Sequence, residues 1–216
     1  MSIPDIQDLL RAARLVPVLT FHDAAQAPDL ARALVAGGVR VLEVTLRTPA
    51  GAVAAAAIRK EVPEAVVGLG TIMTTRDLDL ARDLGVPFAF SPGATPDLLD
   101  AAVAARRRGD AFAFVPGVGT ASELMAAVAR GFSTVKLFPA KQVGGIGLLK
   151  ALAGPFPEVR FCPTGGIAET EIGDYLSLPN VLAVGGSWLA PPEEIARADW
   201  SLITARAKRA LAAVAA

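Results

Sequence analysis

Residues 41–46 read Val-Leu-Glu-Val-Thr-Leu, an almost continuous apolar segment that carries one carboxylate in its middle. Two further segments have the same character, Ala-Phe-Ala-Phe-Val (111–115) and Val-Leu-Ala-Val (181–184). A continuous apolar run, rather than an alternating one, is typical of a parallel strand that is buried on both faces. The segment at 41–46 therefore predicts a parallel sheet covered by helices.

Segments of this kind recur along the chain at intervals of 22 to 25 residues. They begin near Val16, Val41, Val66, Phe88, Ala111, Thr134, Val159 and Val181. The stretches between them have helical periodicity, and examples are Pro28–Ala36, Ala50–Lys60, Arg76–Leu84, Pro96–Arg106 and Ser122–Arg130. Glycines follow these stretches where C-terminal helix caps are expected, at Gly37-Gly38, Gly85, Gly109 and Gly131.

Eight strand–helix units of even size predict an α/β protein with a compact (β/α)8 TIM barrel. An extra helix is expected before the first strand, around Ile3–Arg14. An open, doubly wound sheet is the alternative, and the barrel is favoured because eight evenly sized units close naturally. Since no linker or low-complexity segment interrupts the repeat, residues 1–216 are expected to form a single domain.

The composition narrows the class of protein. The chain has 21 basic and 21 acidic residues, a zero formal net charge that argues against binding to nucleic acid. No apolar run approaches the roughly 18 residues of a membrane span, and the start lacks the basic and apolar regions of a signal peptide. We therefore expect a cytoplasmic protein with no nucleic-acid or membrane partner.

Lys136 is the most informative residue, because it lies in the apolar segment Val-Lys-Leu-Phe-Pro at 135–139. A lysine is seldom buried without a partner or a purpose. Desolvation favours the neutral amine, which can attack a ketone and form an imine. In a barrel, chemistry takes place at the carboxyl ends of the strands, and Lys136 is expected there on the sixth strand.

Glu43 is the matching candidate on the second strand. A carboxylate in the same interior could move protons directly or through water, as imine formation requires. The alternative for both residues is an ion pair that serves the structure alone.

Arg47 and Thr71, just past the second and third strands, are candidates for binding a substrate carboxylate. Gly165-Gly166 and Gly186-Ser187 end the seventh and eighth strands. Barrels often bind phosphate with the loops after these two strands, so these backbone N–H groups predict a phosphate site. Tight turns are the alternative for the glycines, as a surface position is for Arg47.

A metal or nucleotide cofactor is not expected. The chain has one histidine, His22, and one cysteine, Cys162, so a His- or Cys-rich metal site is not available. Gly117-Val118-Gly119 lacks the third glycine of a dinucleotide-binding motif. We interpret Cys162 as a small core residue and His22 as a loop residue.

Several of these segments together resemble the aldolases that act on 2-keto-3-deoxy-6-phosphogluconate (KDPG) and 4-hydroxy-2-oxoglutarate (KHG). They are residues 33–48, Gly-Leu-Gly-Thr (68–71), Ser-Pro-Gly (91–93), Lys-Leu-Phe-Pro-Ala (136–140), Arg-Phe-Cys-Pro-Thr-Gly-Gly-Ile (160–167) and Gly-Gly-Ser-Trp-Leu (185–189). The resemblance runs in order from about Leu30 to Leu189.

The resemblance implies a class I aldolase of the Entner–Doudoroff pathway that needs no metal and forms a homotrimer of barrels. It cleaves KDPG to pyruvate and glyceraldehyde 3-phosphate and has a side activity on KHG. The resemblance also implies roles for residues of this chain. For the chemistry, Lys136 would form the imine and Glu43 would shuttle protons. For substrate binding, Arg47 and Thr71 would bind the pyruvate carboxylate, Thr164 would contact the hydroxyl-bearing part of the substrate, Pro92 and Phe138 would form walls of the site, and the phosphate would be held by Gly165, Gly166, Gly186 and Ser187.

One position departs from the family pattern. Many members have glutamate after Phe-Pro-Ala, whereas this chain has Lys141, which reverses a charge near the mouth of the site. Thr164 favours KDPG over the galactonate epimer, because enzymes for the epimer tend to carry an apolar residue there.

Other functions for the same scaffold are an aldolase for the galactonate epimer and an isomerase or epimerase that uses Glu43 as base and Lys136 only as a cation. A non-catalytic phosphosugar-binding barrel is a third.

Overall fold

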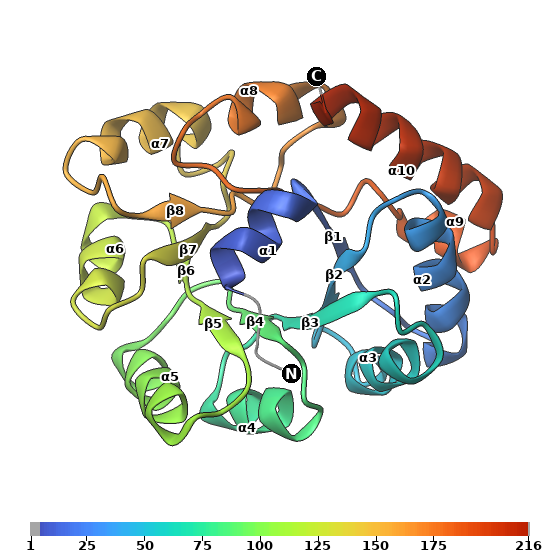
Figure 1. Cartoon of the computed structure of the whole chain (residues 1–216), viewed down its shortest axis with the longest axis horizontal. Coiled ribbons are helices and arrows are strands. Elements are labelled where there is room, and N and C mark those ends of the chain that lie inside the picture. Colours follow the sequence, from blue (N-terminus) through green and yellow to red (C-terminus); the bar gives the residue numbers. More distant parts are fainter. Residues whose placement is uncertain (1–4, 216) are drawn as a thin grey trace.

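The computed structural model describes residues 5–215 and shows a curled parallel sheet with helices on its outside (Figure 1). The strands are β1 (Leu15–Leu19), β2 (Val41–Thr45), β3 (Val66–Gly70), β4 (Phe88–Phe90), β5 (Ala113–Val115), β6 (Gly117–Val118), β7 (Thr134–Leu137), β8 (Arg160–Phe161) and β9 (Val184–Gly186). They form one sheet in the order β5-β4-β3-β2-β1-β9 and another in the order β6-β7-β8.

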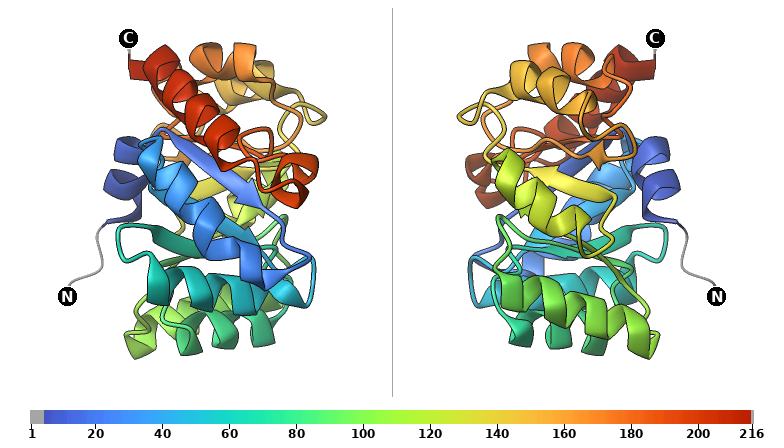
Figure 2. Two further views of the ribbon diagram at one scale, coloured as in Figure 1. Left: turned by 90° about the vertical axis from the view of Figure 1, so that its right-hand side faces the viewer. Right: turned by 90° about the vertical axis from the view of Figure 1, so that its left-hand side faces the viewer.

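The helices that follow the strands pack against the outer face of the sheet, as the side views show (Figure 2), whereas the helix before β1 lies over one end of the strands. The helices are α1 (Ile6–Ala13), α2 (Ala27–Ala36), α3 (Ala50–Glu61), α4 (Thr75–Asp83), α5 (Pro96–Arg108), α6 (Ala121–Val128), α7 (Gly145–Ala153), α8 (Ile172–Leu176), α9 (Pro192–Ala196) and α10 (Trp200–Ala215), with short 3₁₀ turns η1 (Ala24–Gln26) and η2 (Glu169–Glu171). Helix α1 lies within the predicted stretch Ile3–Arg14, of which Ile3 and Pro4 lie outside the described residues.

Threonines and glycines set the ends of these helices. Thr74, Thr95 and Thr120 each accept a hydrogen bond from a backbone N–H of the first turn of α4, α5 and α6, which satisfies a donor that the helix itself cannot pair. Gly109 ends α5 in the left-handed region, at φ 82°, where glycine carries no Cβ penalty. Helices α2 to α6 thus begin and end within two residues of the stretches that the sequence predicts.

The fifth predicted strand is split at Pro116 into β5 and β6. Proline has no N–H to donate to a strand ladder, and the ladder changes partner around it. The N–H of Gly117 donates to Oγ of Ser91 (2.9 Å), and the N–H of Lys136 donates to the carbonyl of Pro116 (2.9 Å). Through this hydrogen bond to Pro116, β7 lies next to the point where one sheet ends at β5 and the other begins at β6.

The other seam lies between β8 and β9. Isolated parallel bridges pair Phe161 with Val181 and Thr164 with Gly185. The N–H of Gly185 also donates to the carbonyl of Pro163 (2.9 Å). These contacts place the end of the β8 segment beside the end of β9, where the two predicted phosphate-binding segments begin.

Two apolar clusters fill the fold. The larger one lies between the strands and the surrounding helices. The smaller one contains Leu10, Val16, Phe88 and Phe90 and is covered by apolar residues of α1, which lies over the middle of the curled sheet in Figure 1. Helix α1 therefore closes the end of the strand layer that is opposite the polar residues described next.

Candidate active site

Lys136 and Glu43 meet inside the sheet. Nζ of Lys136 lies 2.8 Å from Oε1 and 3.0 Å from Oε2 of Glu43, and the two side chains are 4% and 1% exposed. Glu43 points inward from β2, between Val18 of β1 and Gly68 of β3. Lys136 comes from β7, 93 residues further along the chain, so the fold brings together the two candidates that the sequence singled out.

The surroundings of this pair hold both side chains in place. The rings of Phe90 and Phe138 lie 5.2 Å and 5.5 Å from Nζ of Lys136, where their electron-rich faces attract a cation. Behind Glu43, Gly70 leaves the space that the carboxylate fills, because a Cβ on this glycine would lie 2.1 Å from Oε1. Glycine at position 70 is therefore required by the position of Glu43.

A cavity of about 460 Å³ lies near the pair, although neither Lys136 nor Glu43 is among its lining residues. Arg47, Phe138, Thr164, Gly165, Gly166, Gly186 and Ser187 line it, all predicted site residues, together with Val18, Ile167, Ala168, Gly185 and Trp188. Phe138 connects the cavity to the pair, since its ring lies over Lys136. The Arg47 side chain is exposed, and among residues 5–215 we find no ion pair or hydrogen bond that engages it. The Arg47 cation and the two glycine-rich segments at 165–166 and 185–186 thus line one space.

The glycines of this cavity have distinct reasons to be glycine. Gly165 and Gly166 adopt φ of 105° and 75°, a region that L side chains seldom enter. A Cβ on Gly185 would lie 2.2 Å from Oγ1 of Thr164. On Gly186 it would lie 2.3 Å from Nε1 of Trp188. Gly185 and Gly186 therefore leave room for side chains that line the cavity.

Thr71 and Pro92 do not line this cavity. Thr71 follows β3 directly with φ 66°, an uncommon conformation for a β-branched residue. The next residue, Ile72, donates its N–H to the carbonyl of Phe90 (3.0 Å). Pro92 packs against Gly117, where a Cβ would lie 2.3 Å from its carbonyl carbon. Thr71 follows the strand whose Gly70 lies against Glu43, and Pro92 follows the strand whose Phe90 lies against Lys136.

Cys162 is fully buried and free, as expected for a core residue. Burial raises the pKa of its thiol to about 12, although the nearby Lys136 charge opposes the shift. A thiol with this pKa is almost entirely protonated at neutral pH and is a poor nucleophile.

Sequence reasoning missed Phe90 and Trp188. Phe90 lies in an ordinary apolar strand, and nothing in its own segment distinguishes it from Phe88. Trp188 directly follows Ser187 in a quoted segment, and its Nε1 is buried without a hydrogen-bond partner among the described residues. A buried donor without a partner is costly, so this N–H beside the cavity is a notable feature of the site.

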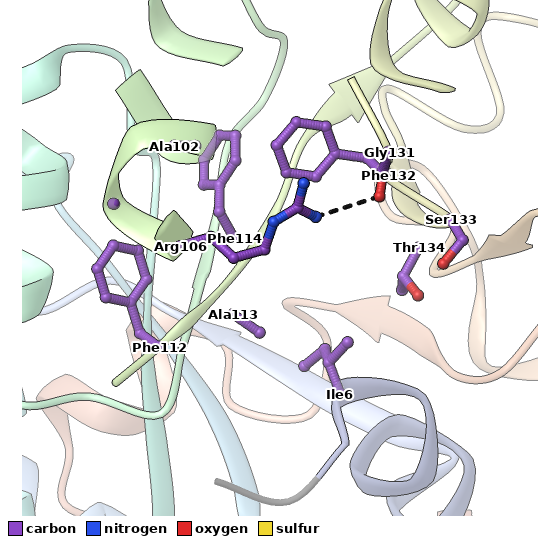
Figure 3. Close-up of a pocket in the computed structure, with 11 residues that line it drawn as sticks. Ile6, Ala102, Arg106, Phe112, Ala113, Phe114, Gly131, Phe132, Ser133 and Thr134 are labelled. Carbon is purple, nitrogen blue, oxygen red and sulfur yellow. Dashed lines mark hydrogen bonds between the residues drawn. The ribbon is translucent and has the colours of Figure 1, made fainter. Parts of the chain in front are cut away.

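Another cavity, of about 180 Å³, lies at the beginning of β5 and β7 (Figure 3). Phe112, Phe114 and Phe132 line it, and Arg106 donates a hydrogen bond to the carbonyl of Gly131 (3.2 Å). It contains none of the predicted site residues and lies at the ends of the strands away from Lys136. We therefore place the candidate active site in the cavity next to Lys136.

Between residues 5 and 215, no three His, Cys, Asp or Glu side chains gather where they could bind a metal ion. Over the same part of the chain, no helix has the length and apolar character needed to cross a membrane.

A lysine–glutamate pair beside a glycine-lined cavity is consistent with the sequence resemblance, and comparison with known proteins settles the family. The family model for KDPG and KHG aldolases matches residues 6–206. The chain belongs to this aldolase family. A 2-dehydro-3-deoxy-phosphogluconate aldolase of Pseudoalteromonas atlantica is 47% identical over 209 residues, which cover 97% of this chain and 95% of that protein.

Solved structures of the aldolase family are also similar. The KDPG aldolase of Legionella pneumophila, with pyruvate captured at low pH as a covalent carbinolamine intermediate, has a TM-score of 0.89 at 41% identity, covering 94% of this chain and 97% of that one. The aldolase of Zymomonas mobilis ZM4 with 3-phosphoglycerate has a TM-score of 0.88 at 46% identity, covering 97% and 96%.

Proposed function

We propose that this protein is a class I aldolase that cleaves KDPG to pyruvate and glyceraldehyde 3-phosphate, and that it also cleaves KHG. The observation that carries the proposal is the buried pair of Lys136 and Glu43, 2.8 Å apart beside the 460 Å³ cavity. Family membership supports it, as does the covalent pyruvate adduct in the Legionella pneumophila relative. The reaction belongs to the Entner–Doudoroff pathway.

The pair provides the groups that imine formation needs. Glu43 accepts a proton from the Lys136 ammonium, and the neutral amine adds to the C2 ketone to give a carbinolamine. Glu43 returns the proton to the C2 hydroxyl, water leaves, and a protonated imine remains. A correctly placed proton donor and acceptor contributes about 10²- to 10⁴-fold to such steps.

The C3–C4 bond of the substrate then breaks, with the protonated imine as the electron acceptor. Glu43, directly or through a water, takes the proton of the C4 hydroxyl, and C4 becomes the aldehyde of glyceraldehyde 3-phosphate. The electrons of the C3–C4 bond form a C2=C3 double bond, the π electrons of the protonated imine move to its nitrogen, and a neutral enamine results. Protonation at C3 and hydrolysis by water release pyruvate and restore the amine of Lys136.

The remaining residues bind the two ends of the substrate. We assign Arg47 and Thr71 to the carboxylate, because a guanidinium binds carboxylates with two parallel hydrogen bonds. The phosphate is assigned to the N–H groups of Gly165, Gly166 and Gly186 and to the hydroxyl of Ser187. Phe138, whose ring lies over Lys136, and Pro92 are assigned as walls around the reacting carbons.

Thr164 is assigned to the hydroxyl-bearing carbons between these ends. Its side chain is nearly buried and lies against Gly185 beside the cavity. We propose that it favours KDPG over the galactonate epimer. Comparing the rates of pyruvate release from the two epimers measures this preference.

We further propose that residues 1–216 form one closed (β/α)8 barrel with an extra N-terminal helix. The bridges between β8 and β9 and the hydrogen bonds around Pro116 support closure of the two sheets into one ring. Assembly as a homotrimer is proposed from the family resemblance, and the cytoplasmic location expected from the sequence stays a proposal.

Borohydride trapping with pyruvate tests the chemistry. Reduction of the imine should add the mass of a pyruvate-derived group to Lys136, located by peptide mass spectrometry. Lys136→Arg keeps the positive charge and should give no adduct, whereas Lys150→Arg, on helix α7, should label normally. Release of pyruvate from KDPG without any adduct on Lys136 would exclude the imine mechanism.

A further inference from the structure

Residues 165–168 form a loop, called the glycine loop here, that lines the cavity at the end of β8. Gly165 and Gly166 have no side chains with which to fix the loop, and both have positive φ. Backbone N–H groups bind an anion well only when they are held in a fixed direction. The glycine loop therefore depends on its neighbours for its conformation.

Lys141 contacts the two glycines that begin the glycine loop. Its N–H donates to the carbonyl of Gly165 (3.1 Å). Its Cβ lies so near Gly166 that a Cβ on this glycine would be 2.9 Å away. Its Nζ donates to both carboxylate oxygens of Glu171, each at 3.0 Å. Lys141 thus lies against the first half of the loop and extends past it to η2.

Glu171 fixes the other end of the glycine loop. Oε2 of Glu171 accepts a hydrogen bond from the N–H of Ala168 at 2.8 Å. This N–H and the Lys141 ammonium together lower the pKa of the Glu171 carboxyl, so the carboxylate is ionised at neutral pH. Hydrogen bonds therefore link Gly165 to Lys141, Lys141 to Glu171 and Glu171 to Ala168, so that both ends of the glycine loop are held.

The pair also shows where the charge of Lys141 is directed at the position that departs from the family pattern. A lysine where many members have glutamate would add a positive charge near the phosphate site. Here Glu171 neutralises this charge and engages Nζ with two hydrogen bonds. The ammonium consequently faces η2, where it supports the loop.

We propose that Lys141 and Glu171 are positioning residues that hold the glycine loop in the conformation that binds the substrate phosphate, without touching the phosphate themselves. This inference rests on the proposed aldolase function. It predicts that loss of either side chain weakens binding of the phosphorylated substrate, while the chemistry at Lys136 and binding of pyruvate are unaffected.

The experiment compares Lys141→Ala and Glu171→Ala with Glu169→Ala as the matched control. Glu169 lies in the same 3₁₀ turn and has the same side-chain exposure of 35%, but it pairs with Arg209 and has no hydrogen bond to the glycine loop. Each variant is assayed for KM and kcat with KDPG. The pyruvate concentration that half-saturates borohydride trapping is the phosphate-free readout.

We expect KM for KDPG to rise about threefold to tenfold in both loop variants, since partly exposed ion pairs and single hydrogen bonds contribute modestly. The half-saturating pyruvate concentration and kcat should stay within about twofold. The double variant should be no worse than Glu171→Ala alone, because the two residues act as one unit. If Glu171→Ala unfolds, Glu171→Gln keeps an acceptor for Ala168 and tests the ion pair alone.

Three outcomes would overturn the inference. An unchanged KM in both variants means that the loop does not need the pair. A lower KM in Glu171→Ala with a higher one in Lys141→Ala means that Lys141 binds the phosphate directly. An equal effect on pyruvate trapping means a general structural role. A wild-type protein that releases no pyruvate from KDPG contradicts instead the proposed function.

Discussion

Gly70→Ala is the substitution whose effect on the active site can be worked out most directly. The backbone of Gly70 lies outside the left-handed region, so alanine fits its conformation. The added Cβ would lie 2.1 Å from Oε1, 2.6 Å from Cγ and 2.7 Å from Cδ of Glu43. Real Cβ contacts shorter than 3.0 Å essentially do not occur, so the carboxylate must move by roughly 1 Å relative to the strand.

This displacement acts on the pair with Lys136. The two hydrogen bonds are now 2.8 and 3.0 Å long, and a shift of this size takes at least one beyond hydrogen-bond range. A misplacement of about 1 Å in a catalytic arrangement costs on the order of 10²-fold in rate. Overpacking of a core typically costs about 1–3 kcal/mol in the free energy of unfolding. We therefore expect a folded, less stable protein with kcat lowered about 100-fold.

The assay couples pyruvate release from KDPG to lactate dehydrogenase, and urea unfolding gives the stability. Gly37→Ala is the control, because its Cβ would lie 2.4 Å from Cβ of Ala207 and overpacks the contact between α2 and α10 instead. If Gly70→Ala retains kcat within about threefold, or if Gly37→Ala loses as much kcat at equal destabilisation, then the position of Glu43 does not control the reaction.

Three further predictions concern other buried groups. Cys162, with its thiol pKa raised to about 12, should resist iodoacetamide at pH 8 in the folded protein and react once urea unfolds it; labelling before unfolding would contradict its burial. The Arg206 guanidinium lowers the pKa of the Glu194 carboxyl, so Glu194→Gln should cost about 2 kcal/mol of unfolding free energy at pH 7. That difference should shrink as the pH falls below the ordinary glutamate value and through the lowered one, and a pH-independent difference in urea unfolding would refute the linkage. Nε1 of Trp188 is buried beside Gly186 without a hydrogen-bond partner among the described residues, and we predict that this N–H donates to the substrate phosphate. Trp188→Phe should therefore raise KM for KDPG and leave the half-saturating pyruvate concentration unchanged, with Trp200→Phe as the control. Equal effects in both variants would mean that the N–H does not bind the phosphate.

The strands were predictable because each is a buried apolar run of nearly constant spacing. Their ends were less so, as the fifth strand shows. The apolar residues continue through Pro116, but the ladder does not, since a residue without an N–H must change the hydrogen-bond partners around it. The hydrophobic pattern predicts which residues are buried, but it does not show where a strand changes its hydrogen-bond partners.

For the site, the sequence predicted which residues face inward at the ends of strands. Which of them touch depends on the stagger of the strands, a property of the whole curled sheet rather than of any segment. Lys136 and Glu43 satisfied both requirements, and the structure confirms their contact. The partner of Lys141 could not be found this way, because Glu171 lies in a 3₁₀ turn of a loop whose path is set by its neighbours.

The separation of Glu43 and Lys136 by 93 residues has a consequence for protein synthesis. At typical elongation rates of about 5–20 residues per second, roughly 5 to 20 seconds pass between the emergence of the two side chains from a ribosome. During that time the carboxylate has no ammonium to pair with, and a lone buried charge is strongly unfavourable. The first strands of the nascent chain should therefore keep Glu43 in contact with water until β7 is synthesised. Insertion of β7 would then both exclude water from around Glu43 and complete the active site.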